Sequence, residues 1–419
     1  MLISYETPVA NLAVKNNKQS TKEQRGPDRT KYGKLILRQA YLSKTLDMRD
    51  KAYRICRDYL NGAWKTIGPD TMVLKQISGG LSNFLYYCAL PPGTKIKRKE
   101  PSKVLLRMYG DIHGERALDS LVTDSVIFAL LSERKLGPRL YGIFPGGRLE
   151  EFIPARPLKT CELSDPHLSG MIAEKLATIH SLNVPLIKEP TWLWDTLNKW
   201  ISNLDAVLVT GLKNPDSIYY AEKIESFNLK EELSWLKNYL SLVGSPVVFC
   251  HNDFQEGNIL YRESAKTREN QIVIIDFEYC SYNYRGFDLA NHFCEWTVNN
   301  SYGKGSGFLF TPEDQASPEQ KLHFLRSYIH TFKEEMGLND EEIFKQNGKL
   351  AVTLSENFLL KEIETFTLGS HFFWGLWGVI SSSSKIPFGY WDYALTRLNA
   401  YFDLKSRLLE SSTPLCIRT

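Results

Sequence analysis

The stretch HNDFQEGNIL at residues 251–260 holds the densest group of polar side chains in the chain. A short apolar segment, PVVFC at residues 246–250, leads into it, and apolar residues follow it. Short apolar runs bounded by polar turn residues are typical of buried strands. The sequence therefore predicts two short strands joined by a polar loop that carries His251, Asp253 and Asn258.

The order and spacing of these three residues match the catalytic-loop pattern of kinases, H-x-D-x-x-x-x-N. Phosphoryl transfer needs a carboxylate that orients the attacking hydroxyl and receives its proton, together with an oxygen ligand for magnesium close by. We expect Asp253 to be that base and Asn258 to be a metal ligand. His251 is expected to orient the loop by hydrogen bonding rather than to act as a base.

A second apolar run, IVII at residues 272–275, ends in an acidic residue, Asp276. Kinases present their principal metal ligand in this way, and magnesium prefers oxygen ligands. Asp276 is expected to bridge magnesium to the phosphates, and Glu278 to help hold a second metal through water. Taken singly, each acid is more simply a loop cap or a turn residue. The ordered set, following an apolar strand each time, favours the kinase site.

Upstream, residues 71–90 predict two strands around the glycine-centred turn Ser78-Gly79-Gly80-Leu81-Ser82-Asn83. The backbone of this turn could lie over nucleotide phosphates, and a plain hairpin turn is the alternative. Arg107, in a third strand, stands where kinases place the cation that grips the α- and β-phosphates. Asp124, on the helix that follows, could pair with it. Simple surface exposure is the alternative for both residues.

Strands dominate the chain up to residue 155, and helices dominate after it. Further strands are expected at 140–144 and 148–153, and helices at 48–64, 117–135, 164–181, 191–208 and 229–243. We therefore predict an α+β, protein-kinase-like bilobal fold, with a ligand cleft between the lobes. Its parts are a mostly flexible basic N-terminal tail at 1–47, a strand-rich N-lobe at 48–155 and a helical C-lobe at 156–419.

The composition is that of an ordinary globular protein, with 43% apolar and 24% charged residues. The net charge of +3 does not imply a polyanionic partner, so no nucleic acid is expected. The longest apolar stretch, roughly residues 366–380, is shorter than the about 20 residues that span a bilayer, so no membrane insertion is expected. The 7 cysteines are scattered and form no C-x-x-C pair, which fits a reduced cytoplasmic compartment.

Several long stretches together resemble the choline/ethanolamine kinase family. Besides HNDFQEGNIL, they are ISGGLSN (77–83), VLLRMYG (104–110), LGPRLYGIFPGGRLEEFIPARP (136–157), IDFEYCSYNYRGFDLANHFCEW (275–296) and HFFWGLWG (371–378). The likeness runs in order from about residue 51 to 408. It implies an ATP:choline phosphotransferase that makes phosphocholine and ADP, the first step of phosphatidylcholine synthesis by the CDP-choline route. Members often form dimers, so a homodimer is one expected assembly.

The resemblance also implies roles for individual residues. Asp253 would be the catalytic base, and Mg²⁺ would bind Asn258 and Asp276, with Glu278 nearby. The segment Glu151-Phe152-Ile153-Pro154 resembles the interlobe hinge that reads adenine through backbone groups. ATP would be contacted by Ser78, Gly79, Gly80, Leu81, Ser82, Asn83, Arg107, Glu151, Phe152, Ile153, Gln255 and Asp276.

The expected acceptor pocket follows from the chemistry of a quaternary ammonium, which donates no N–H hydrogen bond. Aromatic faces and a nearby carboxylate hold such a cation. Trp374 and Trp377 are three positions apart and share a helix face, although paired tryptophans at this spacing are also common in plain cores. Around the choline head group, with Asp253, the resemblance places Tyr279, Glu295, Trp374, Trp377 and Tyr393.

Three positions depart from the family pattern. Ser78 stands where some members have arginine, Asp124 where glutamate is usual, and Asn300 where some have tyrosine near the acceptor. Asn300 thins the aromatic cage, so an ethanolamine kinase remains an alternative. An aminoglycoside phosphotransferase and a nucleotide-binding protein without catalysis are further alternatives. No His/Cys spacing suggests zinc, and no G-x-S-x-G motif supports hydrolase chemistry.

Overall fold

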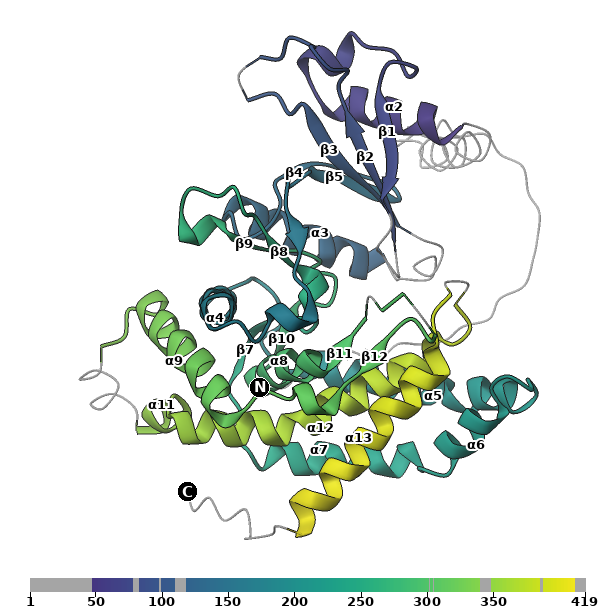
Figure 1. Cartoon of the computed structure of the whole chain (residues 1–419), viewed down its shortest axis with the longest axis vertical. Coiled ribbons are helices and arrows are strands. Elements are labelled where there is room, and N and C mark those ends of the chain that lie inside the picture. The colour runs from purple at the N-terminus through teal and green to yellow at the C-terminus, as the bar shows by residue number, and fades with distance from the viewer. Residues whose placement is uncertain are drawn as a thin grey trace, which may run out of the picture.

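The chain folds into two lobes, a small one built on a sheet and a larger one that is mainly helical (Figure 1). The α+β bilobal fold predicted from the sequence is confirmed. The computed structural model describes residues 47–77, 83–97, 99–109, 118–300, 302–303, 305–339, 348–384 and 387–410. The predicted tail at 1–47 and the turn at 78–82 therefore lie almost entirely outside the described residues.

The small lobe is an antiparallel sheet covered by helix α2 (Met48–Tyr59) and a short 3₁₀ turn at Gly62–Lys65. In sheet order, the strands are β1 (Val73–Ile77), β2 (Asn83–Ala89), β3 (Lys103–Tyr109), β5 (Gly147–Glu151) and β4 (Leu140–Phe144). Cys56 and Trp64 from the helical cover pack on Leu106 and Leu149 in a core of their own. The predicted strands are all present, with ends that differ by a few residues.

Helix α3 (Leu118–Glu133) follows β3 but contributes its buried residues to the core of the large lobe. Phe128 lies edge-on to Phe277, with ring centroids 6.3 Å apart. Gly137 lets the chain pass Phe277 closely, because a Cβ at this position would lie 2.5 Å from that ring. Helix α3 is therefore fixed to the segment that carries Asp276.

The large lobe is organised around α12 (Glu356–Ser381), which packs against α13 (Tyr390–Glu410), α8 (Arg285–Cys294) and α5 (Thr191–Leu212) (Figure 1). The other helices are α4 (Pro166–His180), α6 (Ile218–Glu225), α7 (Leu229–Ser241), α9 (Pro318–Glu335) and α11 (Gly348–Thr353). The sequence did not predict α6. No helix in the described part of the chain is long and apolar enough to cross a membrane.

Short strands in the large lobe carry the loops of interest. One sheet has the order β6 (Arg156–Pro157), β8 (Ile259–Tyr261) and β9 (Ile272–Ile274), and β7 (Val247–Cys250) pairs with β10 (Ser281–Tyr284). A further pair joins β11 (Val298–Asn299) to β12 (Leu309–Phe310). The sequence predicted β7, β8 and β9, and it missed β6, β10, β11 and β12.

Local sequence signals explain where several helices begin. The side chain of Asp165 accepts a hydrogen bond from the backbone N–H of Leu168, and Pro166 occupies the first turn of α4. Ser317 and Gln320 form a reciprocal capping box at the start of α9. These caps satisfy backbone donors that a helix end leaves without partners.

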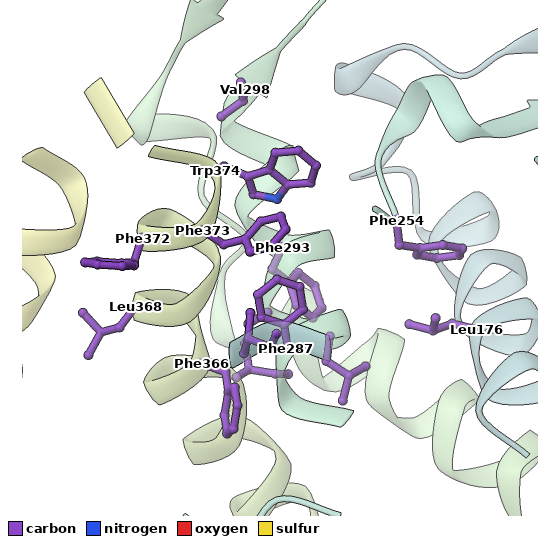
Figure 2. Packing of buried hydrophobic residues seen from close by; sticks show 14 of the residues in the cluster. Leu176, Phe254, Phe287, Phe293, Val298, Phe366, Leu368, Phe372, Phe373 and Trp374 are labelled. Atoms are coloured by element: carbon purple, nitrogen blue, oxygen red, sulfur yellow. The ribbon is translucent and has the colours of Figure 1, made fainter. Parts of the chain in front are cut away.

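Rings from α8 and α12 fill the centre of the large lobe. Figure 2 shows Phe373 and Trp374 projecting from α12 above Phe287 and Phe366. The ring centroids of Phe373 lie 5.5 Å from Phe287 and 5.2 Å from Trp374, both in edge-to-face geometry. Such ring pairs stabilise a core by more than the burial of their apolar area alone contributes. Trp374 thus stands at the edge of this core with its orientation fixed.

Glycine allows α12 and α13 to approach closely. A Cβ on Gly378 would lie 3.0 Å from both the Cβ of Ala394 and the backbone oxygen of Tyr390. The close crossing brings Trp377 against Tyr390 and Tyr393, with centroid distances of 5.7 and 5.9 Å.

We predict that Gly378→Val forces the two helices apart and lowers the free energy of unfolding by about 1–3 kcal/mol, the usual cost of overpacking. Denaturant unfolding measures this loss. Gly348→Val is the control, because nothing lies within 4 Å of a Cβ at Gly348. Equal stability of the two variants would contradict the close-packed crossing.

Candidate active site

The loop between β7 and β8 contains His251, Asp253 and Asn258, as predicted. Its backbone turns sharply at Asn252, whose φ of 66° lies in the left-handed region. Asparagine tolerates this conformation better than most residues. The side chain of Asn252 donates to the carbonyl of Tyr279 at 2.8 Å, and its Oδ1 accepts from Asn283 at 2.8 Å. The turn is therefore held from the β10 side.

A buried carboxylate, Asp288 on α8, anchors the same turn. Its Oδ2 accepts the backbone N–H of His251 at 2.7 Å, and its Oδ1 accepts that of Asn252 at 2.8 Å. Burial alone would raise the pKa of Asp288, but hydrogen bonds and charge from His180, together with His251, lower it below its usual range. An ionised acceptor thus fixes two successive N–H groups directly before Asp253.

His180 and Tyr328 support Asp288 from behind. His180 Nε2 donates to Asp288 at 3.0 Å, and its Nδ1 lies 2.7 Å from the Tyr328 hydroxyl. Among the described residues, His180, Cys250 and Asp288 are close enough to share an ion. Hydrogen bonds already occupy Asp288, and burial raises the pKa of the Cys250 thiol, which disfavours thiolate. We interpret this cluster as a structural support of the loop.

His292 supports the loop at Phe254, the residue that follows Asp253. Its Nδ1–H donates to the carbonyl of Phe254 at 3.2 Å, and its Nε2 accepts from the indole N–H of Trp296 at 3.3 Å. Both bonds require the neutral ring, because a protonated imidazole has no acceptor. Burial lowers the pKa of His292 to about 4, which agrees with this geometry.

Asp253 and Asn258 are in direct contact. The amide nitrogen of Asn258 donates to the backbone carbonyl and to Oδ2 of Asp253, both at 2.9 Å. Because the nitrogen is engaged twice, the amide oxygen is the atom that can ligate a cation. Burial, and then the charges of Glu295, Asp276 and Glu278, raise the pKa of Asp253 well above its usual value. The arrangement favours Asp253 as a proton acceptor.

Asp276 lies two residues after the end of β9 and adopts a φ of 65°, in the left-handed region that strains residues other than glycine. His251 Nε2 donates to the carbonyl of Ile275 at 3.0 Å, which ties this segment to the catalytic loop. The predicted orienting role of His251 agrees with this bond. Burial alone would raise the pKa of Asp276, but Arg107 and Arg148 outweigh that effect and lower it.

Arg107 is buried in β3 and connects the two lobes. Its Nη1 lies 3.3 Å from Asp276, and its Nε lies 3.4 Å from Glu150. Arg148 also binds Glu150, at 2.8 Å. The sequence predicted the position of Arg107 but not Glu150 as its partner. The pairing of Arg107 with Asp124 stays a prediction.

The expected nucleotide contacts are placed only in part. Ser78, Gly79, Gly80, Leu81 and Ser82 lie outside the described residues, and Asn83 begins β2. Glu151 ends β5, and its backbone N–H donates to the carbonyl of Arg139 at 2.8 Å. Phe152 packs edge-on to Tyr87 at 4.7 Å, and Ile153 is buried. Gln255 folds back to accept the Gly257 N–H at 3.0 Å.

Four of the predicted acceptor residues form a continuous row of aromatic rings. Tyr279 contacts Trp374 at 6.0 Å, Trp374 contacts Trp377 at 5.6 Å, and Trp377 contacts Tyr393 at 5.9 Å. Tyr279 lies three positions after Asp276, so the row begins beside the metal-binding candidates. Its rings come from three distant parts of the chain, which argues that the fold builds this wall.

Glu295 is buried in the 3₁₀ turn Glu295–Thr297, after α8. Its Oε1 accepts from Arg397 at 2.9 Å, and its Oε2 accepts from Asn300 at 3.0 Å. Its charge contributes to the raised pKa values of both Asp253 and Tyr393, so its electrostatic effect reaches both side chains.

Sequence reasoning missed four charged residues of the site: Asp288, Glu150, Glu256 and Arg397. Glu256 is buried in the catalytic loop, where burial and Glu295 raise its pKa to about 8. Its Oε1 accepts from the Thr160 hydroxyl at 3.2 Å. A charged residue inside a long polar motif could have signalled Glu256. Asp288 and Arg397 bind partners far away in sequence, and Glu150 binds the distant Arg107 as well as its near neighbour Arg148. None of the three carried a local signal.

The site combines a carboxylate held by an amide, a second carboxylate held by a buried arginine, and a row of aromatic rings. Together with the two-lobed fold, it defines a phosphotransferase of the protein-kinase-like class. A family model described as choline/ethanolamine kinase matches residues 74–402. The chain belongs to the choline/ethanolamine kinase family, and ATP is the phosphate donor of such a kinase.

Known proteins agree with this membership. A choline/ethanolamine kinase of Rattus norvegicus is 44% identical over 373 residues, covering 89% of this chain and 90% of the relative. Choline kinase alpha of Mus musculus is 44% identical over 379 residues, covering 86% and 81%. The crystal structure of a choline kinase from Cryptosporidium parvum Iowa II matches with a TM-score of 0.67 at 27% identity, covering 86% of this chain and 96% of that one.

We predict that Asp288→Asn lowers kcat at least about 100-fold, because an amide cannot accept both backbone N–H groups and His180 at once and the loop shifts. Steady-state kinetics test this effect by measuring kcat and the KM for ATP in the variant and in wild type. The KM for ATP should change much less than kcat. A near-normal kcat would contradict the anchoring role.

Acid is expected to destabilise the fold through His292. Its folded pKa of about 4 lies below the unfolded value of about 6.5, so its stabilising contribution is present above pH 6.5 and is lost as pH falls towards 4. The linkage amounts to about 2 kcal/mol between pH 7 and pH 5. Denaturant unfolding at pH 7 and pH 5 measures how much unfolding free energy is lost on acidification. This loss should be smaller by about 2 kcal/mol in His292→Gln than in wild type. Identical losses would contradict a neutral buried His292.

Proposed function

We propose that the protein transfers the γ-phosphate of ATP to the hydroxyl of choline, giving phosphocholine and ADP. The observation that carries this proposal is the row of four rings from Tyr279 to Tyr393 beside Asp253 and Glu295. Aromatic faces attract a quaternary ammonium, which cannot donate a hydrogen bond. The similarity to choline kinase alpha supports the same acceptor.

Asp253 would orient the choline hydroxyl and receive its proton. A general base works best when its pKa lies near the operating pH, and the pKa of Asp253 is raised. Asn258 holds Oδ2, which leaves Oδ1 as the atom that can accept the proton. Most of the rate enhancement would come from positioning and charge neutralisation.

Magnesium fits the oxygen donors that the site offers. The carboxylate of Asp276 and the amide oxygen of Asn258 would hold it, with Glu278 nearby, because a hard cation prefers oxygen ligands. The lowered pKa of Asp276 keeps this carboxylate ionised and ready to ligate. Bound Mg²⁺ would neutralise charge on the ATP phosphates. Arg107, 3.3 Å from Asp276, would supply a second cation there.

Ethanolamine is a second candidate acceptor because of Asn300. This residue presents an amide beside Glu295 rather than another ring. A primary ammonium donates hydrogen bonds and needs oxygen acceptors, which Glu295 and Asp253 provide. The aromatic row favours choline, and direct competition between the two amino alcohols measures the preference.

The proposal is tested by magnesium-dependent ADP release from the purified protein with choline, with ethanolamine and without acceptor. Strong stimulation by choline is expected, and omission of Mg²⁺ should abolish it. Stimulation by ethanolamine alone would show that ethanolamine, and not choline, is the acceptor. No stimulation by either amino alcohol would contradict the proposed function.

Asp253→Ala is expected to lower turnover by about 10²–10⁴-fold, the usual contribution of a general base. Folding should change little, because Asn258 keeps its bond to the backbone carbonyl of residue 253. Asp205→Ala is the matched control, since Asp205 is an exposed carboxylate on α5 paired with Lys230. Near-normal turnover of Asp253→Ala would exclude Asp253 as the base.

A further inference from the structure

A single buried guanidinium lies behind the acceptor wall. Arg397 on α13 is 0% exposed, and its Nη1 donates to Glu295 Oε1 at 2.9 Å. Its guanidinium carbon lies 5.7 Å from the centroid of the Tyr393 ring. One side chain thus contacts two of the acceptor candidates at once.

The same guanidinium is linked to a third candidate by a chain of three hydrogen bonds. Its Nη2 donates to Ser370 Oγ at 3.1 Å, and Ser370 Oγ lies 2.9 Å from Asn291 Oδ1. Because arginine only donates, the serine hydroxyl accepts from Arg397 and directs its own proton to Asn291. The indole N–H of Trp374 donates to the same Asn291 oxygen at 2.6 Å. The orientation of the Trp374 ring therefore depends on a chain that starts at Arg397.

Arg397 also holds the charge of Glu295. It is the buried counter-ion of this carboxylate, with Nη1 2.9 Å from Oε1. With Asn300 bound to the other oxygen, the Glu295 carboxylate is fixed at both ends. A buried charge that loses its partner becomes costly and reorients towards other donors. Removal of Arg397 would therefore disturb Glu295 first.

We propose that Arg397 is the positioning residue of the acceptor site, which presets Glu295, Tyr393 and Trp374 for a small cationic alcohol. The inference rests on the proposed function, because it takes these residues as the acceptor pocket. Arg397 acts through them, so its loss should weaken acceptor binding far more than nucleotide binding. Its contacts lie in the 3₁₀ turn Glu295–Thr297, in α12 and in α13, and none of them is a predicted ATP contact among the residues that the structure describes.

A second buried arginine provides a matched comparison. Arg285 on α8 is 1% exposed, binds Glu362 at 2.8 Å and donates to the carbonyl of Thr353 at 2.7 Å. It belongs to the same lobe and forms the same kind of ion pair. None of these partners is an acceptor candidate. A purely structural role for Arg397 would make the two arginines behave alike when substituted.

The test measures KM for the acceptor and KM for ATP independently in wild type, Arg397→Lys, Arg397→Met and Arg285→Lys. The acceptor is whichever amino alcohol stimulates wild type. Lysine can still pair with Glu295 but lacks the fork that also reaches Ser370. We expect Arg397→Lys to raise the acceptor KM at least about tenfold, the scale of one charge-assisted hydrogen bond, and Arg397→Met to raise it further. In both Arg397 variants, the KM for ATP should stay within about twofold of the wild-type value. In Arg285→Lys, the KM for the acceptor and the KM for ATP should both stay within about twofold of wild type.

Ser370→Ala removes only the middle hydroxyl and should raise the acceptor KM in the same direction by a smaller factor, which keeps the test available if Arg397→Met does not fold. Three results would overturn the proposal: an acceptor KM unchanged in Arg397→Lys, equal rises in both KM values, or the same acceptor effect in Arg285→Lys. These results leave the proposed function intact. An inactive wild type would instead contradict the proposed function, and this inference with it.

Discussion

The carboxylate of Asp288 is the constraint on which the catalytic loop depends. It accepts two successive backbone N–H groups, those of His251 and Asn252, and so holds the left-handed turn that precedes Asp253. His180 fixes Asp288 from α4. Because Asp288 lies on α8, which packs against α12, the loop that carries Asp253 and the helix that carries Trp374 and Trp377 share one support. Asp253 and these aromatic rings are therefore positioned together.

The surroundings of Asp253 and Asp276 push the pKa values of these two carboxylates apart. Asp253 has acidic neighbours and an elevated pKa, whereas Asp276 has Arg107 and Arg148 nearby and a depressed one. An acid pair tuned in opposite directions suits the proposed roles of Asp253 as proton acceptor and Asp276 as metal ligand. Arg107, which reaches Asp276 from the small lobe, also links this tuning to the contact between the lobes.

Local patterns predicted the two lobes and the loop of His251, Asp253 and Asn258, because strand and helix periodicity and short motifs are written within a few neighbouring positions. The aromatic residues of the expected acceptor pocket came from the resemblance to the choline/ethanolamine kinase family. The charged residues that hold the site in place could not be predicted from the sequence. Asp288, Glu150 and Arg397 find partners 37, 43 and 102 positions away, and no local pattern marks such pairs. The short strands β10, β11 and β12 were missed for a similar reason, since pairing with a distant strand rather than periodicity defines them.

The central claim is that the site moves a phosphoryl group to the hydroxyl of choline. Phosphorus NMR of the products formed from ATP, Mg²⁺ and choline tests it most directly. The account predicts a phosphomonoester resonance that coincides with added phosphocholine and grows in step with ADP. Formation of inorganic phosphate in place of the ester, or unchanged ATP, would contradict it.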